Sequence, residues 1–314
     1  MLDSAKIYND LQQELFELDK ERIRFYSKVR PFKYLFWIPF LAGGVYFLWI
    51  INIVYRDPEA YLVFVFGGWN FVALIAYLTV GHYNREKFKV LFNGAIAPKI
   101  INGLGESFSY DYKGQIPVQE IKGSQLFKSF GTYSCQDLVM GVIDDVAIKF
   151  AEIKMTKTVR SSGSNGSSRE QNIFRGFFFA AALELKFPTK IWLVTASNAD
   201  ISKTGLKKIR IDHPALKPYT VFAEDDTLAK KVLQPFILEK IRELNSKLRK
   251  EKIAIFKTSV SFYFEDQTIK MAIKTSKKFM EPRLSQTVNS QKFIEKQTRL
   301  LNTLSGLLKD LTLK

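Results

Sequence analysis

Four acidic residues in the middle of the chain have side chains and spacing that could do chemistry: Asp137, Asp144, Asp145 and Glu152. Carboxylates that gather at one place can bind a divalent cation or serve as general acid and base. These four do not follow the regular ligand spacing of a calcium-binding loop. We therefore expect carboxylates in turns or facing solvent, and we keep an enzyme with an unrecognised carboxylate site as the alternative function.

Other reactive residues are few. The chain has one cysteine, Cys135, and two histidines, His82 and His213. A single cysteine excludes an intramolecular disulfide and any CxxC-type metal or redox site. Gly103-Leu104-Gly105 and the Ser/Gly-rich segment 161–168 lack the further residues of nucleotide-binding loops. The sequence thus predicts no catalytic residue, no metal and no cofactor, and it favours a non-enzymatic protein while leaving activity undecided.

Composition narrows the class of partner. The 314 residues carry 47 Lys and Arg against 31 Asp and Glu, a net charge of +16, and 46% of them are hydrophobic. This is too apolar for a disordered chain, and the positive charge predicts an anionic partner. Nucleic acid is disfavoured because no module interleaves basic with aromatic residues. Arg175 followed by three phenylalanines is more simply a core strand.

The elements that must position these residues begin with two uncharged stretches, residues 34–55 and 61–80. Each corresponds to about 30 Å of helix, which matches the hydrocarbon core of a bilayer. The link between them, residues 56–60, is short and contains a proline. A buried soluble hairpin is the alternative, but soluble helices rarely stay uncharged for so long. Residues 34–80 are therefore predicted to form a transmembrane helical hairpin.

Cations flank the outer ends of this hairpin, whereas the link holds Arg56 alone. The positive-inside rule then places both termini in the cytoplasm and the link outside. Six residues are expected to contact the anionic lipid surface: Lys28, Arg30, Lys33, Arg85, Lys87 and Lys89.

Inside the predicted hairpin, small residues lie at similar depth on the two helices. Small side chains let helix backbones approach each other, and an amide in lipid needs a protein or water partner. We expect the helices to touch at Gly43, Gly44, Gly67 and Gly68, with Asn70 facing that contact or a second copy of the protein. Alternatively, Asn70 bonds its own backbone one turn back.

The remaining chain is predicted to be α+β. Residues 101–314 hold 35 Lys and Arg against 22 Asp and Glu, a net charge of +13. Alternating apolar residues predict strands at 138–144, 146–159, 173–185, 191–195 and 219–223, and a hairpin of 253–264 with 268–273. Helical spacing predicts helices from Ser4, over 118–128, from Asp225 with a kink at Pro235, and from Val288. The domains are then 1–33, an amphipathic basic helix; 34–80, the hairpin; 84–286, one mostly antiparallel α+β domain; and 287–314, a C-terminal helix.

A series of short motifs along residues 84–285 resembles a known family. The motifs are, in order, Leu126-Phe127, Tyr133, Asp137-Leu138-Val139, Gly141, Phe150-Ala151-Glu152, Ile173-Phe174-Arg175-Gly176-Phe177-Phe178, Tyr219-Thr220-Val221-Phe222, Asp225-Asp226, Leu233-Gln234-Pro235 and Phe279-Met280-Glu281-Pro282. Together with the twin apolar stretches before them, they are similar to the bacterial domain-of-unknown-function family 3137. Cys135-Gln136 departs from the small and acidic pair of that pattern.

The resemblance implies a fold, a location in the inner membrane of a bacterium and a set of neighbouring genes, but no activity. Members of this family are often encoded near LemA-type membrane proteins, which implies such a protein as a partner. The sequence as a whole predicts a membrane-anchored, non-enzymatic protein whose basic cytoplasmic domain binds a partner protein or the lipid surface. The alternative is a membrane-tethered enzyme that uses the four acidic residues.

Overall fold

The computed structural model describes residues 3–53, 60–103, 105, 107–143, 145–160, 168–195, 206–251, 260–276 and 278–312. Side chains are described for these residues except 36, 38–53, 60–70, 305 and 307–312. Two compact units emerge. The sheet unit consists of residues 1–7, 97–280 and 294–314, and the helical unit consists of residues 8–96 and 281–293.

The sheet unit contains a seven-stranded antiparallel sheet. Its strands are β1 (Ser109–Asp111), β2 (Thr132–Ile143), β3 (Val146–Arg160), β4 (Ser168–Val194), β5 (Lys207–Ile209), β6 (Thr220–Ala223) and β7 (Val260–Lys274). The order is β1-β2-β3-β4-β6-β5, and β7 pairs with β4. This confirms the predicted mixed fold with an antiparallel sheet.

Strand β4 is the longest strand and organises the others. Its first half pairs with β3 along one edge, its second half pairs with β6, and β7 runs along its other edge. Sequence alternation predicts two strands here, at 173–185 and 191–195, but the structure joins them into one. Register shifts after Ala182 and around Phe187 let the strand bend without ending.

Strand β7 corrects a second prediction. The turn expected at Glu265-Asp266-Gln267 does not form a hairpin, because residues on both sides of it pair with the same strand, β4. Asp266 adopts a left-handed backbone conformation, with φ of 51°, inside this irregularity. Residues 253–259 of the predicted first strand lie outside the described residues.

The helices are α1 (Ser4–Asp10), α2 (Gln12–Ile53), α3 (Ala60–Ala95), α4 (Ala97–Asn102), α5 (Val118–Gly123), α6 (Asp226–Val232), α7 (Pro235–Lys250) and α8 (Gln291–Thr312), with a 3₁₀ turn, η2, at Pro214–Leu216. The helix predicted from Asp225 is in fact two helices, α6 and α7. Pro235 lacks an N–H and cannot continue α6, and it occupies the first turn of α7 instead. Asp225 caps α6 by accepting a hydrogen bond from the Leu228 N–H at 2.8 Å.

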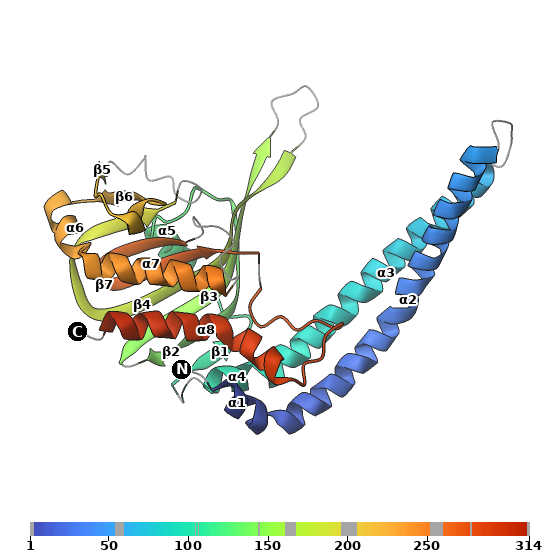
Figure 1. Ribbon diagram of the computed structural model, residues 1–314, viewed down its shortest axis with the longest axis horizontal. Helices are drawn as coiled ribbons and strands as arrows, with labels where there is room; N and C mark the ends of the chain where they lie inside the picture. The colour runs from blue at the N-terminus through green and yellow to red at the C-terminus, as the bar shows by residue number, and fades with distance from the viewer. Residues whose placement is uncertain are drawn as a thin grey trace. The chain divides into compact units, whose positions relative to one another are not determined.

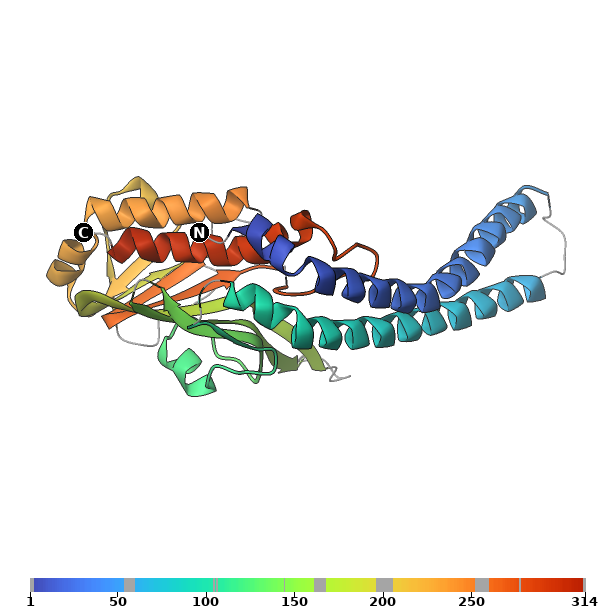
Figure 2. The same ribbon diagram turned by 90° about the horizontal axis from the view of Figure 1, so that it is seen from below.

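Both faces of the sheet are covered, as Figure 2 shows: α7 and α8 lie over one face and α5 lies over the other. The face toward α5 buries alternate β3 and β4 residues such as Ile153, Met155 and Phe178. Intervening residues, including Phe150 and Phe177, are also buried. Helix α7 buries the predicted apolar stripe, which confirms its amphipathic pattern: Ile237, Ile241, Leu244 and Leu248.

The helical unit consists mainly of α2 and α3, which pack against each other (Figure 1). The stripe predicted near the N-terminus is buried as expected, at Ile7, Leu11, Leu15 and Leu18. Among the described residues, no helix has a stretch long and apolar enough to cross a membrane. Most side chains of the two predicted spans, 34–55 and 61–80, lie outside the described residues, so the hairpin stays a prediction.

Candidate functional site

The six cations predicted to contact lipid lie on α2 and α3. Five of them are exposed, namely Lys28, Arg30, Lys33, Arg85 and Lys87, and Lys89 is half-buried. We call these six residues the cationic collar. Two of its lysines lie over aromatic rings of the same helix: Lys87 Nζ is 4.5 Å from the Tyr83 ring centre, and Lys28 Nζ is 5.8 Å from that of Phe25. Such cation–π contacts orient a side chain while its charge stays available.

Large apolar side chains are exposed beside the collar. On α2 they are Tyr34, Leu35 and Trp37, and on α3 they are Phe71, Val72, Ile75 and Leu78. Soluble proteins expose apolar residues singly, whereas contiguous exposed patches mark a surface that meets lipid or a partner. A band of apolar and aromatic residues next to lysines and arginines is the arrangement found where helices enter a bilayer.

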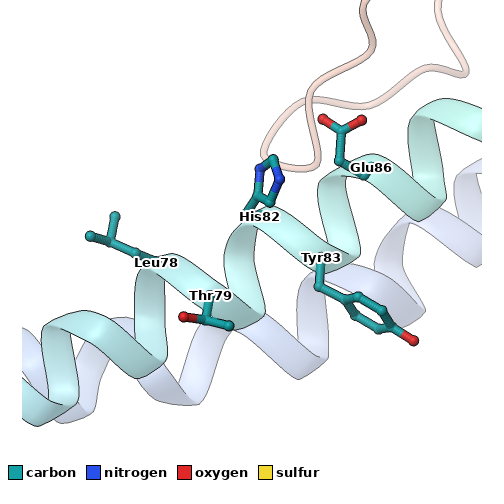
Figure 3. A pocket seen from close by; sticks show the side chains of 5 residues that line it. All are labelled: Leu78, Thr79, His82, Tyr83 and Glu86. Carbon is teal, nitrogen blue, oxygen red and sulfur yellow. The ribbon is translucent and has the colours of Figure 1, made fainter.

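Two shallow depressions lie along α3, on the side of this band that is nearer the C-terminal end of the helix. Leu78, Thr79, His82, Tyr83 and Glu86 line the first, which has a volume of about 530 Å³. Figure 3 shows His82 and Glu86 on one side of the helix and Tyr83 pointing away from them. The second has a volume of about 540 Å³ and shares Tyr83 and Glu86 with the first. His82, two residues after the end of the second predicted span, is an exposed residue of this region.

The predicted contacts inside the membrane remain predictions. The side chains of Gly43, Gly44, Gly67, Gly68 and Asn70 lie outside the described residues.

Two of the four predicted acidic residues are buried on the sheet. Glu152 on β3 is 6% exposed and accepts a hydrogen bond from the Phe279 N–H at 3.2 Å. The Gln136 side chain also hydrogen bonds to it, and Arg175 Nη2 lies 3.9 Å from its Oε1. Burial raises the pKa of this carboxyl group, and the hydrogen bonds and nearby positive charges only partly oppose that effect. Glu152 therefore ties the Phe279 segment to the sheet.

Asp137 lies at a bulge in β2, where the register with β3 shifts between Gln136 and Val139. Its backbone φ is 58°, and its side chain is fully buried. The Tyr110 hydroxyl donates a hydrogen bond of 2.6 Å to its Oδ1. Burial, together with the charge of Asp137, raises the pKa of Tyr110, so the phenol stays a donor. This pair closes the contact between β1 and β2.

The remaining predicted residues do not join these two. Asp145 is an exposed turn residue with φ of 65°, and Asp144 lies outside the described residues. Cys135 is buried, and burial raises the pKa of its thiol. His213 caps the 3₁₀ turn, since its Nδ1 accepts a hydrogen bond from the Ala215 N–H at 3.2 Å. Within the described ranges, no three His, Cys, Asp or Glu side chains form a group that could hold a metal ion.

Sequence reasoning missed an acid in the helical unit. Asp19 on α2 binds Arg22 through both of its oxygens, at 2.7 and 3.2 Å. It also accepts hydrogen bonds from the Val288 N–H at 2.9 Å and the Thr287 hydroxyl at 3.0 Å, while Arg22 donates to the Leu284 carbonyl at 2.6 Å. Burial acts to raise the pKa of Asp19, but these donors outweigh burial and the pKa lies below its ordinary value.

The spacing of Asp19 and Arg22, three apart on a helix, is a local signal that could have indicated the ion pair. Nothing in the local pattern indicates that the pair holds a segment near residue 288.

Two motif glycines have a packing reason. A Cβ atom at Gly176 would collide with the backbone carbonyl of Ile273 on β7, and one at Gly141 would overlap the Phe108 ring. Glycine therefore lets β4 approach β7 and lets Phe108 lie over β2. Glu152 and Phe279, which belong to two other motifs, bond to each other. These motif residues thus serve the fold.

The fold and these sites define a class of protein in which a bent antiparallel sheet, covered on both faces, is linked in one chain to a long helical hairpin. Residues 172–313, from β4 into α8, match the family model described as "Protein of unknown function (DUF3137)". This region therefore matches the family that the motifs predicted, whereas the motifs before residue 172 precede the matched range.

Two further comparisons add little. No curated relative matches the sequence. Among solved structures, the chain is similar to the crystal structure of the mycobacterial trehalose monomycolate transport factor A, TtfA, with 11% identity and a TM-score of 0.31, over 65% of this chain and 88% of that one. A likeness at this score carries no functional argument.

Proposed function

We propose that the chain is a membrane-anchored, non-enzymatic protein whose basic domain lies in the cytoplasm and binds a partner protein or the anionic lipid surface. The anchor is the hairpin of residues 34–55 and 61–80. Both termini face the cytoplasm of a bacterial inner membrane, and a LemA-type membrane protein is a candidate partner. Gly43, Gly44, Gly67 and Gly68 line the contact between the two spans.

The observation that supports this proposal is the collar beside the exposed apolar band. Residues such as Trp37 and Phe71, the latter 64% exposed, would be costly in water but not in lipid. The cations follow at the cytoplasmic side of the band on both helices. Near an anionic leaflet, each lysine or arginine can gain about 1 kcal/mol.

A non-enzymatic role is supported by what the buried acids do. Glu152 and Asp137 are each occupied by hydrogen bonds that hold β1, β3 and the Phe279 segment in place. Neither lines the two depressions on α3.

Labelling of single cysteines in the full chain tests the anchor and its orientation. In a Cys135→Ser background, Pro58→Cys should react with an impermeant maleimide added to cells whose outer membrane has been opened. Ser27→Cys, at an exposed position on α2, should react only after the inner membrane is permeabilised. Release of the chain by alkaline carbonate, or equal labelling at both positions, would reject the proposal.

The collar has its own test. Replacement of its six cations by glutamine should invert a large fraction of the molecules, because the positive-inside bias is lost. A control replaces three cations at the end of α7, Lys247, Arg249 and Lys250, and should keep the orientation. An unchanged orientation of the collar variant would show that these residues do not set the topology.

A further inference from the structure

The second depression on α3 is an apolar groove between two helices. Phe25 of α2 forms one wall, and Tyr83, Glu86, Lys87, Val90 and Leu91 of α3 form the other. Tyr83, Val90 and Leu91 are 56%, 53% and 43% exposed. The groove volume of about 540 Å³ falls within the range of roughly 300–1,000 Å³ that is usual for small-molecule sites.

Position along the helix separates this groove from the bilayer. Val90 follows Val80, the last residue of the predicted span, by about 15 Å at 1.5 Å per residue. The headgroup region is only some 5–8 Å thick on each side, so the far end of the groove lies beyond it. Insertion of the hairpin would therefore leave Val90 and Leu91 in water unless something else covers them.

Two cations lie at or next to the groove. Lys87 lines it and lies over the Tyr83 ring, and Lys28, which is not a lining residue, has its Nζ 5.8 Å from the ring centre of Phe25, which is. Glu86 contributes one carboxylate, so these three groups together carry a net charge of +1. An apolar floor with a positive rim is complementary to an amphiphile that has an acyl chain and an anionic headgroup.

A second copy of the chain fits this groove less well. Six side chains line it, whereas a stable interface takes about 20–30 residues from each partner. The first depression adjoins it through Tyr83 and Glu86 and extends to Leu78, within the predicted span. This gives a path along α3 from the bilayer to the groove.

We infer that this groove binds the acyl chain of an anionic phospholipid outside the bilayer core, with the headgroup held by Lys87 and Lys28. The inference rests on the proposed function and deepens it, because it assigns lipid handling to the membrane-proximal helices. The site would take one lipid molecule from the inner leaflet along α3.

The test uses the full chain in neutral nanodiscs and a lysophosphatidylglycerol probe with a diazirine in its acyl chain. Labelling should fall on residues 83–91, and lysophosphatidylcholine should label them at least fivefold less. Val90→Glu and Leu91→Glu should each reduce the labelling about tenfold, and Lys87→Gln should remove the preference for the anionic headgroup. Ile23→Glu, which changes an exposed apolar residue of α2 outside the groove, is the matched control and should label as the parent does.

Two results would overturn the inference. One is labelling confined to residues 71–80, which would mean lipid contact at the bilayer alone. The other is a disulfide-linked dimer of Val90→Cys, in a Cys135→Ser background, that forms equally with and without the probe. Carbonate extraction of each variant distinguishes a failure of the groove proposal from a failure of the proposed membrane anchor. A chain that stays in the membrane but is not labelled contradicts the lipid groove and leaves the anchor intact.

Discussion

Two carboxylates hold the segment that leaves β7, and they do so in opposite electrostatic settings. Glu152 on the sheet is buried and accepts a hydrogen bond from the Phe279 N–H, and Arg175 Nη2 lies 3.9 Å from its Oε1. Asp19 on α2 accepts from Arg22, Thr287 and Val288 at 2.7 to 3.0 Å. Burial dominates at Glu152 and raises its pKa, whereas close donors dominate at Asp19 and lower its pKa.

The contrast teaches how a fold can use the same chemical group in two ways. A carboxylate with close charged donors contributes most when it is ionised. A carboxylate in an apolar surrounding accepts its hydrogen bond at a cost in desolvation, so its neutral form is favoured.

The largest effect is expected for Asp19→Ala. It removes the acceptor of three groups and leaves Arg22 without its carboxylate, and hydrogen bonds to charged groups contribute about 1.5–3 kcal/mol. Hydrogen exchange at residues 287 and 288 should accelerate about 30-fold, which corresponds to about 2 kcal/mol. Asp10→Ala, an exposed aspartate on α1, is the control and should leave that exchange unchanged. Equal exchange in both variants would mean that Asp19 does not hold the segment.

A smaller effect is expected for Glu152→Ala. The Phe279 N–H loses its acceptor in a buried place, which costs about 1–2 kcal/mol. Exchange-detected mass spectrometry should show faster exchange around residue 279, with little change at residue 288. Glu170→Ala, at an exposed site on β4, serves as the control. If exchange at residue 288 accelerated as much as exchange at residue 279, Glu152 and Asp19 would not hold their two parts of the segment independently.

The pH dependence should separate the two carboxylates further. The lowered pKa of Asp19 means that its stabilisation is complete above the ordinary value of 3.8 and is lost as the pH falls through the folded pKa. The raised pKa of Glu152 means that stability declines as the pH rises from the ordinary 4.5 through the folded pKa.

Between pH 4.5 and 7, opening at residue 279 should therefore become easier while opening at residue 288 stays constant, after correction for intrinsic exchange rates. Glu152→Gln should remove the pH dependence at 279. A persistent slope in that variant would assign it to another group.

The smallest effect is expected for a half-buried ion pair near the surface, where solvent screens the attraction. Glu120 on α5 and Lys149 on β3 form a pair at 2.6 Å with side chains 21% and 37% exposed. Surface pairs contribute about 0.2–1 kcal/mol, and salt weakens them. Lys149→Met should lower the free energy of unfolding by about 0.5 kcal/mol at low salt, measured by denaturant titration. A loss above about 1.5 kcal/mol would contradict this prediction, because the pair would then contribute as much as the contacts of Asp19.

Much of the fold could be predicted from local patterns. The period of the apolar residues located the start of α2, α7, β3 and the second half of β2, because these residues recur at helical or strand spacing. The union of 173–185 with 191–195 into one strand could not be predicted, since the bend is set by pairing with β7, far away in sequence. The effect of Pro235 could not be predicted either. The local pattern is compatible with one kinked helix or with two helices, and the packing of α6 and α7 determines that two form.

The candidate sites show the same difference between features that the local sequence predicts and features that depend on distant contacts. The collar and the apolar band follow from the local composition of α2 and of α3, each read along the chain. The bond between Glu152 and Phe279 spans 127 residues, and that between Asp19 and Val288 spans 269. Such contacts depend on the completed fold, so a sequence that shows four acids close together cannot tell which of them is buried.

The pairing of β4 with β7 has a consequence for how the protein is made. Gly176 pairs with Lys274, so the partner of this part of β4 leaves the ribosome nearly a hundred residues later. At about 5–20 residues per second, roughly 5–20 seconds pass before that partner is available. During this time Phe177, Phe178 and Phe179 stand on a strand with one open edge, a form prone to associate with other chains. Nascent chains stalled between residues 200 and 260 should therefore require chaperone protection, and the requirement should end once residue 274 has emerged.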